Sequence, residues 1–197
     1  MTTTTTMAAA GADPRSAIAP ITCDTTGTRE KALASLLEQI MDSYSVSDDE
    51  KPLADAVEAF LRSKPHLTVH RHGDTVVAST SLGRPRRVVL AGHLDTVPVI
   101  DNFPLIREDI AAAHPGGRVM WGRGATDMKA SDAVFLYLAA TLVDPQYDLT
   151  YVFYDHEEVA AEKNGLRKVA EAHPDWIAGD FAIIGEPTDC GIEGGCN

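Results

Sequence analysis

The sequence predicts an α/β fold in which helices pack in layers against a sheet of strands. Two observations support this prediction. Short runs rich in β-branched and aromatic residues alternate with stretches whose apolar residues recur every three or four positions. Several of the strand-like runs also end in charged residues, and α/β sheets hold their sites at the ends of strands. With 197 residues, the chain is long enough for one domain with a sizeable core.

The first part of the chain differs from the rest in composition. It opens with "MTTTTTMAAAGADPRSAIAP", which is low in complexity and lacks both the basic start and the leucine-rich stretch of a signal peptide. We therefore expect residues 1–27 to be a disordered extension and residues 28–197 to form the folded domain.

Two helices are predicted next. From Arg29 onwards, apolar residues recur at helical spacing and form one stripe, namely Leu33, Leu36, Leu37, Ile40 and Met41. The segment "SVSDDEKPLADAVEAFLRS" predicts a second helix, which Ser or Asp caps and which tolerates Pro52 in its first turn. The expected buried face of this helix consists of Leu53, Val57, Phe60 and Leu61.

Strands and a third helix follow. "LTVHRHGDTVVAST" contains two β-rich runs joined around His72-Gly73-Asp74, which predicts a hairpin. We expect a core strand over Arg87–Ala91, a short strand over Arg118–Trp121 and a helix from about Lys129. The inward side of that helix is expected to carry Val134, Phe135, Leu138 and Leu142.

The remaining elements complete the alternation of strands and helices. "DLTYVFYDHEEV" predicts a strand that ends in acidic residues, and "NGLRKVAEAHPDW" predicts a short helix stopped by Pro174. "DFAIIGEPTD" predicts a further strand that ends in Glu-Pro. No internal repeat is visible in the sequence.

Composition argues against several classes of protein. The formal net charge of -12 and the pI near 4.9 argue against nucleic acid as a partner, because phosphate binding needs clustered Lys and Arg. No run of apolar residues is long enough to span a membrane. The cysteines, Cys23, Cys190 and Cys196, are few and show no CxxC spacing. We therefore expect free thiols and a cytoplasmic location rather than a metal site built on sulfur.

Polar residues that are far apart in the sequence follow the predicted strands. His93 ends the run "VVLAG", Asp127 follows "VMWGRGAT", Glu157 and Glu158 follow "LTYVFYD", and Glu186 follows "FAIIG". The carboxyl ends of parallel strands face a common crevice, so these side chains can converge. One imidazole with several carboxylates is a nitrogen and oxygen ligand set, which suits zinc, manganese or cobalt.

The spacing within these motifs predicts their geometry. His93 and Asp95 are two residues apart, and in extended backbone such side chains share a face. The Asp95 carboxylate can therefore take one imidazole N–H while the other nitrogen binds a metal. Glu157 and Glu158 are neighbours, which in extended backbone point in opposite directions, so one can bind metal while the other faces the reacting water.

Each motif also has a simpler interpretation. His93 and Asp95 can form a surface hydrogen bond, Asp127 can cap a helix, and the Glu157-Glu158 pair can lie in the first turn of a helix. His156 is expected to face solvent from a loop. "GRGATD" resembles a dinucleotide-binding loop, but a carboxylate replaces the third glycine and would repel a pyrophosphate. The placement of all four motifs at strand ends favours the metal site over these alternatives.

The motifs "GHLDTVP", "GRGATDMK", "DHEEV" and "IIGEPTD", in this order, resemble the N-terminal signatures of the co-catalytic di-zinc deacylase and exopeptidase family. The resemblance runs from about Arg29 to Asn197 and is strongest to its succinyl-diaminopimelate desuccinylases of actinobacterial type. It implies a three-layer α/β/α fold with a mostly parallel mixed central sheet. Residues 28–197 would be the N-terminal part of the catalytic domain, with the lid and dimerisation domain absent.

The resemblance also implies roles for individual residues. His93, Glu158, Glu186 and the bridging Asp127 would bind two zinc ions, for which cobalt can substitute. Asp95 would orient His93, and the peptide bond after Asp127 would be cis. Glu157 would be the general base, which passes a proton from the attacking water to the leaving amine.

The implied reaction is hydrolysis of the amide bond of N-succinyl-LL-2,6-diaminopimelate to succinate and LL-2,6-diaminopimelate in lysine and diaminopimelate biosynthesis. Acetylornithine deacetylases and metallopeptidases belong to the same family and remain alternatives, as does a non-catalytic metal-binding fragment. Family members continue beyond "EGGCN" with the last metal-binding histidine, and the full-length proteins form homodimers. The remaining histidines of this chain lie in or beside the hairpin or in loops and do not match that position: His66, His70, His72, His114 and His173.

Overall fold

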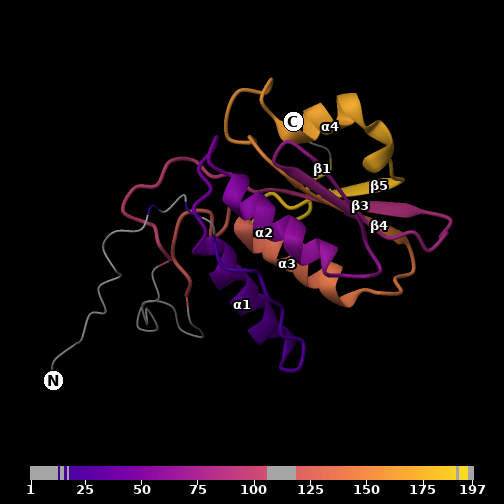
Figure 1. Ribbon diagram of the computed structural model, residues 1–197, viewed down its shortest axis with the longest axis horizontal. Coiled ribbons are helices and arrows are strands. Elements are labelled where there is room, and N and C mark those ends of the chain that lie inside the picture. Colours follow the sequence, from indigo (N-terminus) through magenta and orange to yellow (C-terminus); the bar gives the residue numbers. More distant parts are fainter. Residues whose placement is uncertain (1–12, 14–15, 17, 106–118, 190, 195–197) are drawn as a thin grey trace.

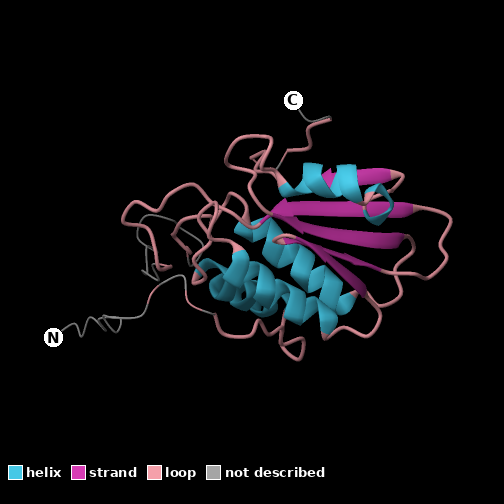
Figure 2. Cartoon of the chain, turned by 45° about the horizontal axis from the view of Figure 1, so that its top comes forward, coloured by secondary structure: helices cyan, strands magenta, loops and turns pink. Residues whose placement is uncertain are grey.

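A computed structural model describes residues 13, 16, 18–105, 119–189 and 191–194 of the chain. Within these residues, one five-stranded sheet lies between two helical layers, as Figures 1 and 2 show. Three helices cover one face of the sheet, and a short helix covers the other. This arrangement confirms the expected three-layer α/β/α fold.

The first two helices match the predicted stripes but not the predicted cap. Helix α1 spans Arg29–Met41, and the hydroxyl of Thr28 caps it by accepting from the Lys31 N–H. Helix α2 spans Lys51–Arg62, with Pro52 in its first turn as expected. Its N-cap residue is Glu50, which makes no side-chain cap hydrogen bond, so the expectation of a Ser or Asp cap is wrong. Ser47 and Asp48 instead bind other loops, as described below.

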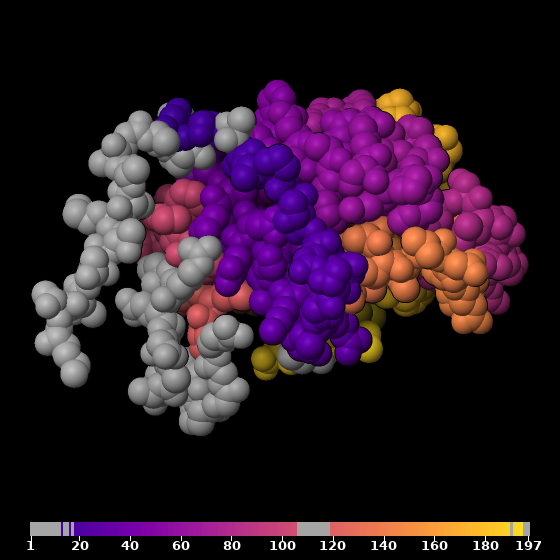
Figure 3. All heavy atoms as spheres, turned by 60° about the horizontal axis from the view of Figure 1, so that its bottom comes forward, coloured from indigo at the N-terminus to yellow at the C-terminus, as the bar shows by residue number. Residues whose placement is uncertain are grey.

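Helix α3 spans Lys129–Thr141, and its buried face differs from the predicted one. Phe135 is buried as expected, but Val134 is 41% exposed and Leu142 is 38% exposed. The buried stripe runs instead through Lys129, Asp132, Ala133, Phe135, Leu136 and Ala139. The prediction was wrong because it followed apolar spacing alone, whereas Lys129 and Asp132 are buried and Asp132 lies against Gly92. In the space-filling view of Figure 3, the indigo spheres of α1 lie at the front of the molecule.

The strands are β1 (Thr68–His72), β2 (Thr75–Ser79), β3 (Arg87–His93), β4 (Asp148–Tyr154) and β5 (Phe181–Ile184). Their order in the sheet is β1-β2-β4-β3-β5. β1 and β2 form the predicted hairpin around Gly73. Gly73 has a φ of 62°, which glycine adopts readily because it has no side chain. β2 pairs antiparallel with β1 and β4, whereas β3 pairs parallel with β4 and β5. The sheet is therefore mixed, with β2 running against the other four strands.

Alternate residues of the central strands form two apolar cores. On β4, Leu149, Tyr151 and Phe153 pack toward α1, α2 and α3, and Val152 and Tyr154 pack on the opposite side. On that opposite side, helix α4 (Gly165–Ala172) contributes Val169 to the second core. Every residue of β4 is buried, as expected of a central strand covered on both faces.

The topology brings three strand ends together. β3 lies between β4 and β5, and all three run parallel, so their carboxyl ends lie at the same edge of the sheet. The connection from β4 to β5 crosses β3 by way of α4 and the short 3-10 helix η2 (Pro174–Trp176). This edge is where an open α/β sheet forms its ligand crevice.

Strand β5 lies at the margin of the sheet. Among the described strands it pairs only with β3, and Phe181 and Ile183 on it are 64% and 46% exposed. A hollow of about 460 Å³ lies beside it, lined in part by Ala91, Leu166 and Ile184. This hollow is apolar and lies on the α4 side of the sheet, away from the polar residues at the strand ends.

Two sequence expectations fall partly outside the described residues. The first is the expected strand Arg118–Trp121, of which Arg118 lies outside the described residues. Val119 to Trp121 form no strand, and only Trp121 takes part in an isolated bridge. Of the expected disordered extension, residues 18–27 are described, and here Ile21 is 7% exposed and packs in the core. Thr22 also hydrogen-bonds to Gln39 of α1. The packed part of the chain therefore begins before residue 28.

The turn between β2 and β3 depends on Asp148, the first residue of β4. Its buried carboxylate accepts hydrogen bonds from the Thr80 hydroxyl at 2.7 Å, the Leu82 N–H at 2.8 Å and the Arg84 N–H at 2.9 Å. Burial acts to raise the pKa of Asp148, but these hydrogen bonds outweigh it and hold the pKa below its usual value. The carboxylate form therefore stabilises the folded chain.

We expect Asp148→Asn to lower the free energy of unfolding by about 1–3 kcal/mol, because an amide cannot satisfy all three donors. Since the folded-state pKa lies below the unfolded one, the carboxylate's contribution should be full above about pH 4 and lost as the pH falls through the folded pKa. Urea unfolding at several pH values measures this. Asp144→Asn is the control, because Asp144 pairs with Arg84 at the exposed surface and should change stability by less than about 0.5 kcal/mol. Equal effects of the two substitutions would contradict the expectation.

No helix among the described residues has the length and apolar character needed to cross a membrane.

Candidate metal centre

His93 is the last residue of β3 and is fully buried. Its Nδ1 lies 2.9 Å from the backbone carbonyl oxygen of Asp95. A carbonyl can only accept, so Nδ1 carries the hydrogen in the neutral ring and Nε2 is left with a free lone pair. Nε2 points toward the open edge of the sheet, 2.9 Å from Asp127 Oδ1 and 4.0 Å from Glu186 Oε1. This orientation suits metal binding through Nε2.

The Asp95 carboxylate has a different partner from the one the spacing predicts. It lies 3.6 Å from His93 Nδ1, beyond a good hydrogen bond, and the carbonyl of the same residue takes the imidazole N–H instead. The carboxylate accepts from the N–H groups of Glu157 at 2.9 Å and Glu158 at 3.1 Å, and from the Ser47 hydroxyl at 2.7 Å. Asp95 therefore links the imidazole to the loop that carries the paired glutamates.

Asp127 reaches the site from a turn rather than from the end of a strand. Residues 122–128 form bends and turns before α3 begins at Lys129. The N-cap position of α3 is Met128, so Asp127 does not cap the helix. The Asp127-Met128 peptide bond is cis, as the resemblance implies. The Asp127 side chain is 46% exposed, which leaves its carboxylate accessible from the crevice.

Glu157 and Glu158 both approach His93. They lie in the bend that follows β4, where the backbone is not extended, so the expectation that they point in opposite directions is wrong. Their carboxylates and one His93 nitrogen lie within 4.8 Å of one another. The ligand atoms of His93, Asp127 and Glu186 form a second such group, again within 4.8 Å. His93 thus belongs to two groups of potential metal ligands, and the structure brings together all the residues predicted as ligands.

The charges of this site fit a bound cation. Burial raises the pKa of Glu158 and of Glu186, and the charges of neighbouring carboxylates raise each further. Burial opposes protonation of His93, but its hydrogen bond to the Asp95 carbonyl and the negative charges of Asp132 and Asp95 raise its pKa to about 10. Negative charge nearby contributes to the raised pKa of all three side chains, and a divalent cation would neutralise that charge. The donors are nitrogen and oxygen, in keeping with the expected ligand set.

The sequence interpretation missed two buried residues of α3 beneath this site. Asp132 is 1% exposed, lies against Gly92, and neither of its carboxylate oxygens has a hydrogen-bond partner among the described residues. Burial raises its pKa to about 8. Lys129 is 2% exposed and donates to the Ser43 carbonyl at 2.7 Å, and burial lowers its pKa to about 7. Their spacing, one helical turn apart and in phase with Leu136, is the sequence signal that could have revealed them.

Apart from His93 and His156, the described histidines lie away from the centre. His70 and His173 both stack on Trp176, with ring centroids 4.6 Å and 3.9 Å from the centroid of its ring. His72 contacts His173 edge-on. His66 lies against the Ala139 carbonyl of α3. His114, Cys190 and Cys196 fall outside the described residues. Cys23 is a half-buried free thiol near the core.

Curated relatives resemble this chain closely over part of their length. A Mycobacterium tuberculosis protein, whose provisional name is succinyl-diaminopimelate desuccinylase DapE, is 48% identical over 162 residues, which are 82% of this chain and 44% of the relative. The succinyl-diaminopimelate desuccinylase of Corynebacterium glutamicum is 42% identical over 166 residues, covering 82% of this chain and 43% of the relative. The chain therefore spans less than half the length of these two relatives.

Solved structures share the fold at low sequence identity. A tripeptidase from Staphylococcus aureus matches 79% of this chain and 43% of its own with a TM-score of 0.62 and 18% identity. The Bacillus subtilis YXEP protein, described as a dinuclear metal binding peptidase from M20 family, matches 77% of this chain and 41% of its own with a TM-score of 0.53 and 16% identity.

The sequence model of peptidase family M20/M25/M40 matches residues 89–195. The match begins within β3 and extends past Glu186, so it includes every residue of the candidate metal centre. It covers more than half of the chain, and together with the fold and the site this establishes that the chain belongs to peptidase family M20/M25/M40.

Proposed function

We propose that this chain is the N-terminal part of a metal-dependent amidohydrolase that hydrolyses N-succinyl-LL-2,6-diaminopimelate to succinate and LL-2,6-diaminopimelate. The observation that carries the hydrolase proposal is the convergence of one buried imidazole with four carboxylates at the carboxyl edge of the sheet. The substrate is proposed from the relatives, because the two reported above, at 48% and 42% identity, both carry the name of this activity. The proposal places the chain in lysine and diaminopimelate biosynthesis.

His93, Asp127 and Glu186 would hold one zinc ion, and Asp127 and Glu158 would contribute to a second, with cobalt as a substitute. When bound, these ions would polarise the amide carbonyl and lower the pKa of water. Glu157 lies beside the ligands and would take a proton from the attacking water and pass it to the leaving amine. Asp95 would keep His93 in the tautomer that leaves Nε2 free.

Two alternatives to this reaction remain. Acetylornithine deacetylation or peptide hydrolysis is the first alternative, supported by the shared fold of the Staphylococcus aureus tripeptidase. The second alternative is a metal-binding fragment without catalysis, because the proposed assignment gives the second ion only Asp127 and Glu158 among the described residues. The alternatives differ in which substrate is hydrolysed, and an assay of succinyl-diaminopimelate and acetylornithine side by side measures this.

We further propose a cytoplasmic protein whose partner is a small N-acyl amino acid rather than a nucleic acid or a membrane. The net charge of -12 supports the exclusion of nucleic acid. A homodimer is proposed for the longer protein that the relatives represent.

A longer form, which carries the continuation found in the relatives, is expected to hydrolyse succinyl-diaminopimelate faster than acetylornithine. Glu157→Gln should lower kcat by about 10²–10⁴-fold, the usual contribution of a general base, and leave the metal content unchanged. Activity with each substrate and metal content by mass spectrometry are the measurements. Arg167→Met is the control, because Arg167 forms an exposed ion pair with Glu171 on α4. Full activity of Glu157→Gln would exclude Glu157 as the base, and preference for acetylornithine would favour the first alternative.

A further inference from the structure

The backbone turns sharply at His156, directly after β4. His156 has a φ of 59°, in the left-handed region that residues other than glycine rarely occupy. The next two N–H groups, of Glu157 and Glu158, both donate to the Asp95 carboxylate. The turn at His156 therefore directs the two following residues toward Asp95 and the imidazole of His93.

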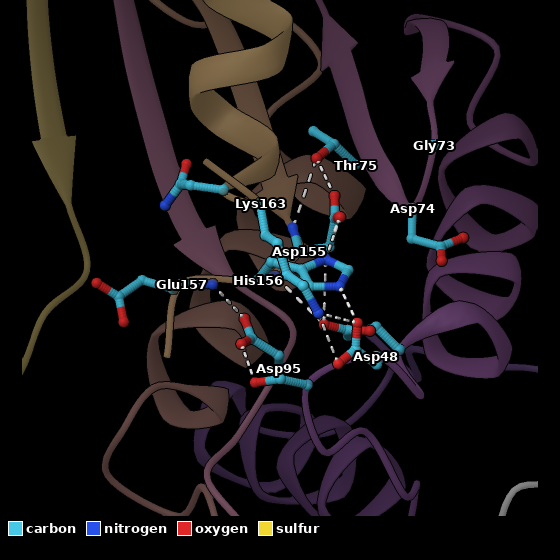
Figure 4. A network of polar contacts seen from close by, with 12 residues as sticks. Asp48, Gly73, Asp74, Thr75, Asp95, Asp155, His156, Glu157 and Lys163 are labelled. Atoms are coloured by element: carbon cyan, nitrogen blue, oxygen red, sulfur yellow. Dashed lines mark hydrogen bonds and ion pairs between the residues drawn. The ribbon is translucent and has the colours of Figure 1, made fainter. Parts of the chain in front are cut away.

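The side chain of His156 is held on both sides, as Figure 4 shows. Its Nδ1 lies 2.6 Å from Asp155 Oδ2, and its Nε2 lies 3.1 Å from Asp48 Oδ1. The imidazole is only 14% exposed. The expectation that His156 faces solvent is therefore wrong, because two carboxylates hold the ring between the loop after β4 and the segment before α2.

That segment, residues 46–50, also contacts the site at other points. Val46 bridges to Thr96, and the Ser47 hydroxyl donates to the Asp95 carboxylate at 2.7 Å. The buried carboxylate of Glu50 accepts from the His156 N–H at 3.3 Å. Residues 46–50 thus bind both the Asp95 loop and the His156 turn.

Both carboxylates that hold the imidazole are themselves fixed. The ammonium group of Lys163 lies 2.7 Å and 2.9 Å from the two oxygens of Asp48. Asp155, which is 5% exposed, accepts from the hydroxyl of Thr75 at the start of β2. Figure 4 shows these contacts as one connected network. Because the partners are held in place, the network can resist rotation of the imidazole and of the turn that it stabilises.

We propose that residues 46–50 and His156 form a clamp that positions Glu157 and Glu158 at the metal centre, with His156 as a positioning residue. The clamp stabilises the left-handed turn through the imidazole. The turn then directs the N–H groups of Glu157 and Glu158 to the Asp95 carboxylate. This proposal rests on the proposed function only for the roles of Glu157 as general base and Glu158 as metal ligand. The geometry of the turn can be tested without metal and without turnover.

Amide hydrogen exchange of the metal-free 197-residue chain tests the clamp directly. In His156→Gly, the backbone can still adopt a positive φ, but the imidazole is missing. We expect the protection of the Glu157 and Glu158 amides to fall at least tenfold, while the Leu94 amide, which donates to the Tyr154 carbonyl, keeps its protection. His156→Asn should retain an intermediate protection, because asparagine tolerates this backbone region and keeps a short polar side chain.

Arg167→Met is the matched control, since it removes a cation near the same loop that lies outside the network. It should leave the exchange of both glutamate amides unchanged. Protection of Glu157 and Glu158 within twofold of the original in His156→Gly would overturn the proposal, because the backbone conformation alone would then fix the turn.

Asp48→Asn provides a second variant in case His156→Gly unfolds the whole chain. It weakens the far anchor of the imidazole without changing the loop itself, and we expect at least a threefold loss of protection at the two glutamate amides. Unchanged protection in Asp48→Asn would overturn the clamp. Absence of hydrolysis in the longer form would count against the proposed function but would leave these exchange results standing, so the two failures are distinguishable.

Discussion

Replacing His93 with alanine is expected to abolish tight zinc binding by this chain. His93 supplies the only nitrogen ligand in both candidate groups of metal ligands among the described residues. Its loss leaves only carboxylates, which suit harder cations than zinc. Loss of an outer-shell partner alone weakens metal sites by about 10–100-fold, so loss of the imidazole should weaken zinc binding by more than about 100-fold.

Calorimetric titration of the metal-free chain with zinc measures this effect. His72→Ala is the control, because His72 is a half-buried histidine in the cluster around Trp176 and contacts no candidate ligand. Circular dichroism of each metal-free variant checks that the fold is intact, since His93 is fully buried. An affinity of His93→Ala within tenfold of the original would contradict the assignment of His93 as a ligand.

The same titration tests the stoichiometry. His93, Asp127 and Glu186 form one group of three candidate ligands, whereas the proposed assignment gives the second ion only Asp127 and Glu158 among the described residues. Three ligands are the usual protein contribution to a catalytic zinc site. We therefore expect about one tightly bound ion per chain, and two tightly bound ions would contradict this.

The sequence was sufficient to predict that His93, the paired glutamates and Glu186 lie together, because strand ends are visible in it, whereas Asp127 reaches the site from a turn and not from the expected strand. The run "VVLAG" ends at His93, and the run "LTYVFYD" ends just before the paired glutamates. Parallel strands bring such ends to one edge whatever the connecting loops do. For the residues at strand ends, the prediction depended on the parallel arrangement of the strands, and the sheet order β4-β3-β5 confirms that these ends adjoin.

The contacts behind the metal centre could not be predicted in the same way. Residues 46–50 are more than a hundred positions from His156 in the sequence, and no periodic pattern relates them. The left-handed conformation at position 156 could not be predicted either, because histidine stands there and not glycine, the usual sequence signal for it. The direction of the two glutamates depends on this turn, which is why an extended backbone was assumed and the assumption failed.

The buried polar face of α3 illustrates a second limit. Apolar spacing places Val134 and Leu142 inward, but the helix is rotated so that Asp132 lies against Gly92 of β3. A buried carboxylate is costly unless neighbouring charges compensate it, and here His93 and Lys129 lower its pKa against the effect of burial. Hydrophobic periodicity describes an ordinary core, so it fails where a core carries charges beside a functional site.

Gly165→Ala is expected to cause the largest loss of stability of any variant considered. Gly165 begins α4 and is buried, and a methyl group on it would overlap both the Asp155 carboxylate and the Thr75 hydroxyl. These two groups hydrogen-bond to each other and are buried, so neither can move aside without breaking that bond. Overpacking costs about 1–3 kcal/mol and a broken buried hydrogen bond adds to it, so we expect a loss of about 3 kcal/mol or more.

Urea unfolding of Gly165→Ala and of Gly27→Ala measures this loss against a matched control. Gly27 has open space around its Cα, so the methyl group there meets no neighbour and should change stability by less than about 1 kcal/mol. Similar stabilities for the two variants would show that Asp155 can relax. Because Asp155 also holds the imidazole of His156, its displacement should reach the metal centre as well. We therefore expect Gly165→Ala to increase amide exchange at Glu157 and Glu158 even under conditions where the chain remains folded.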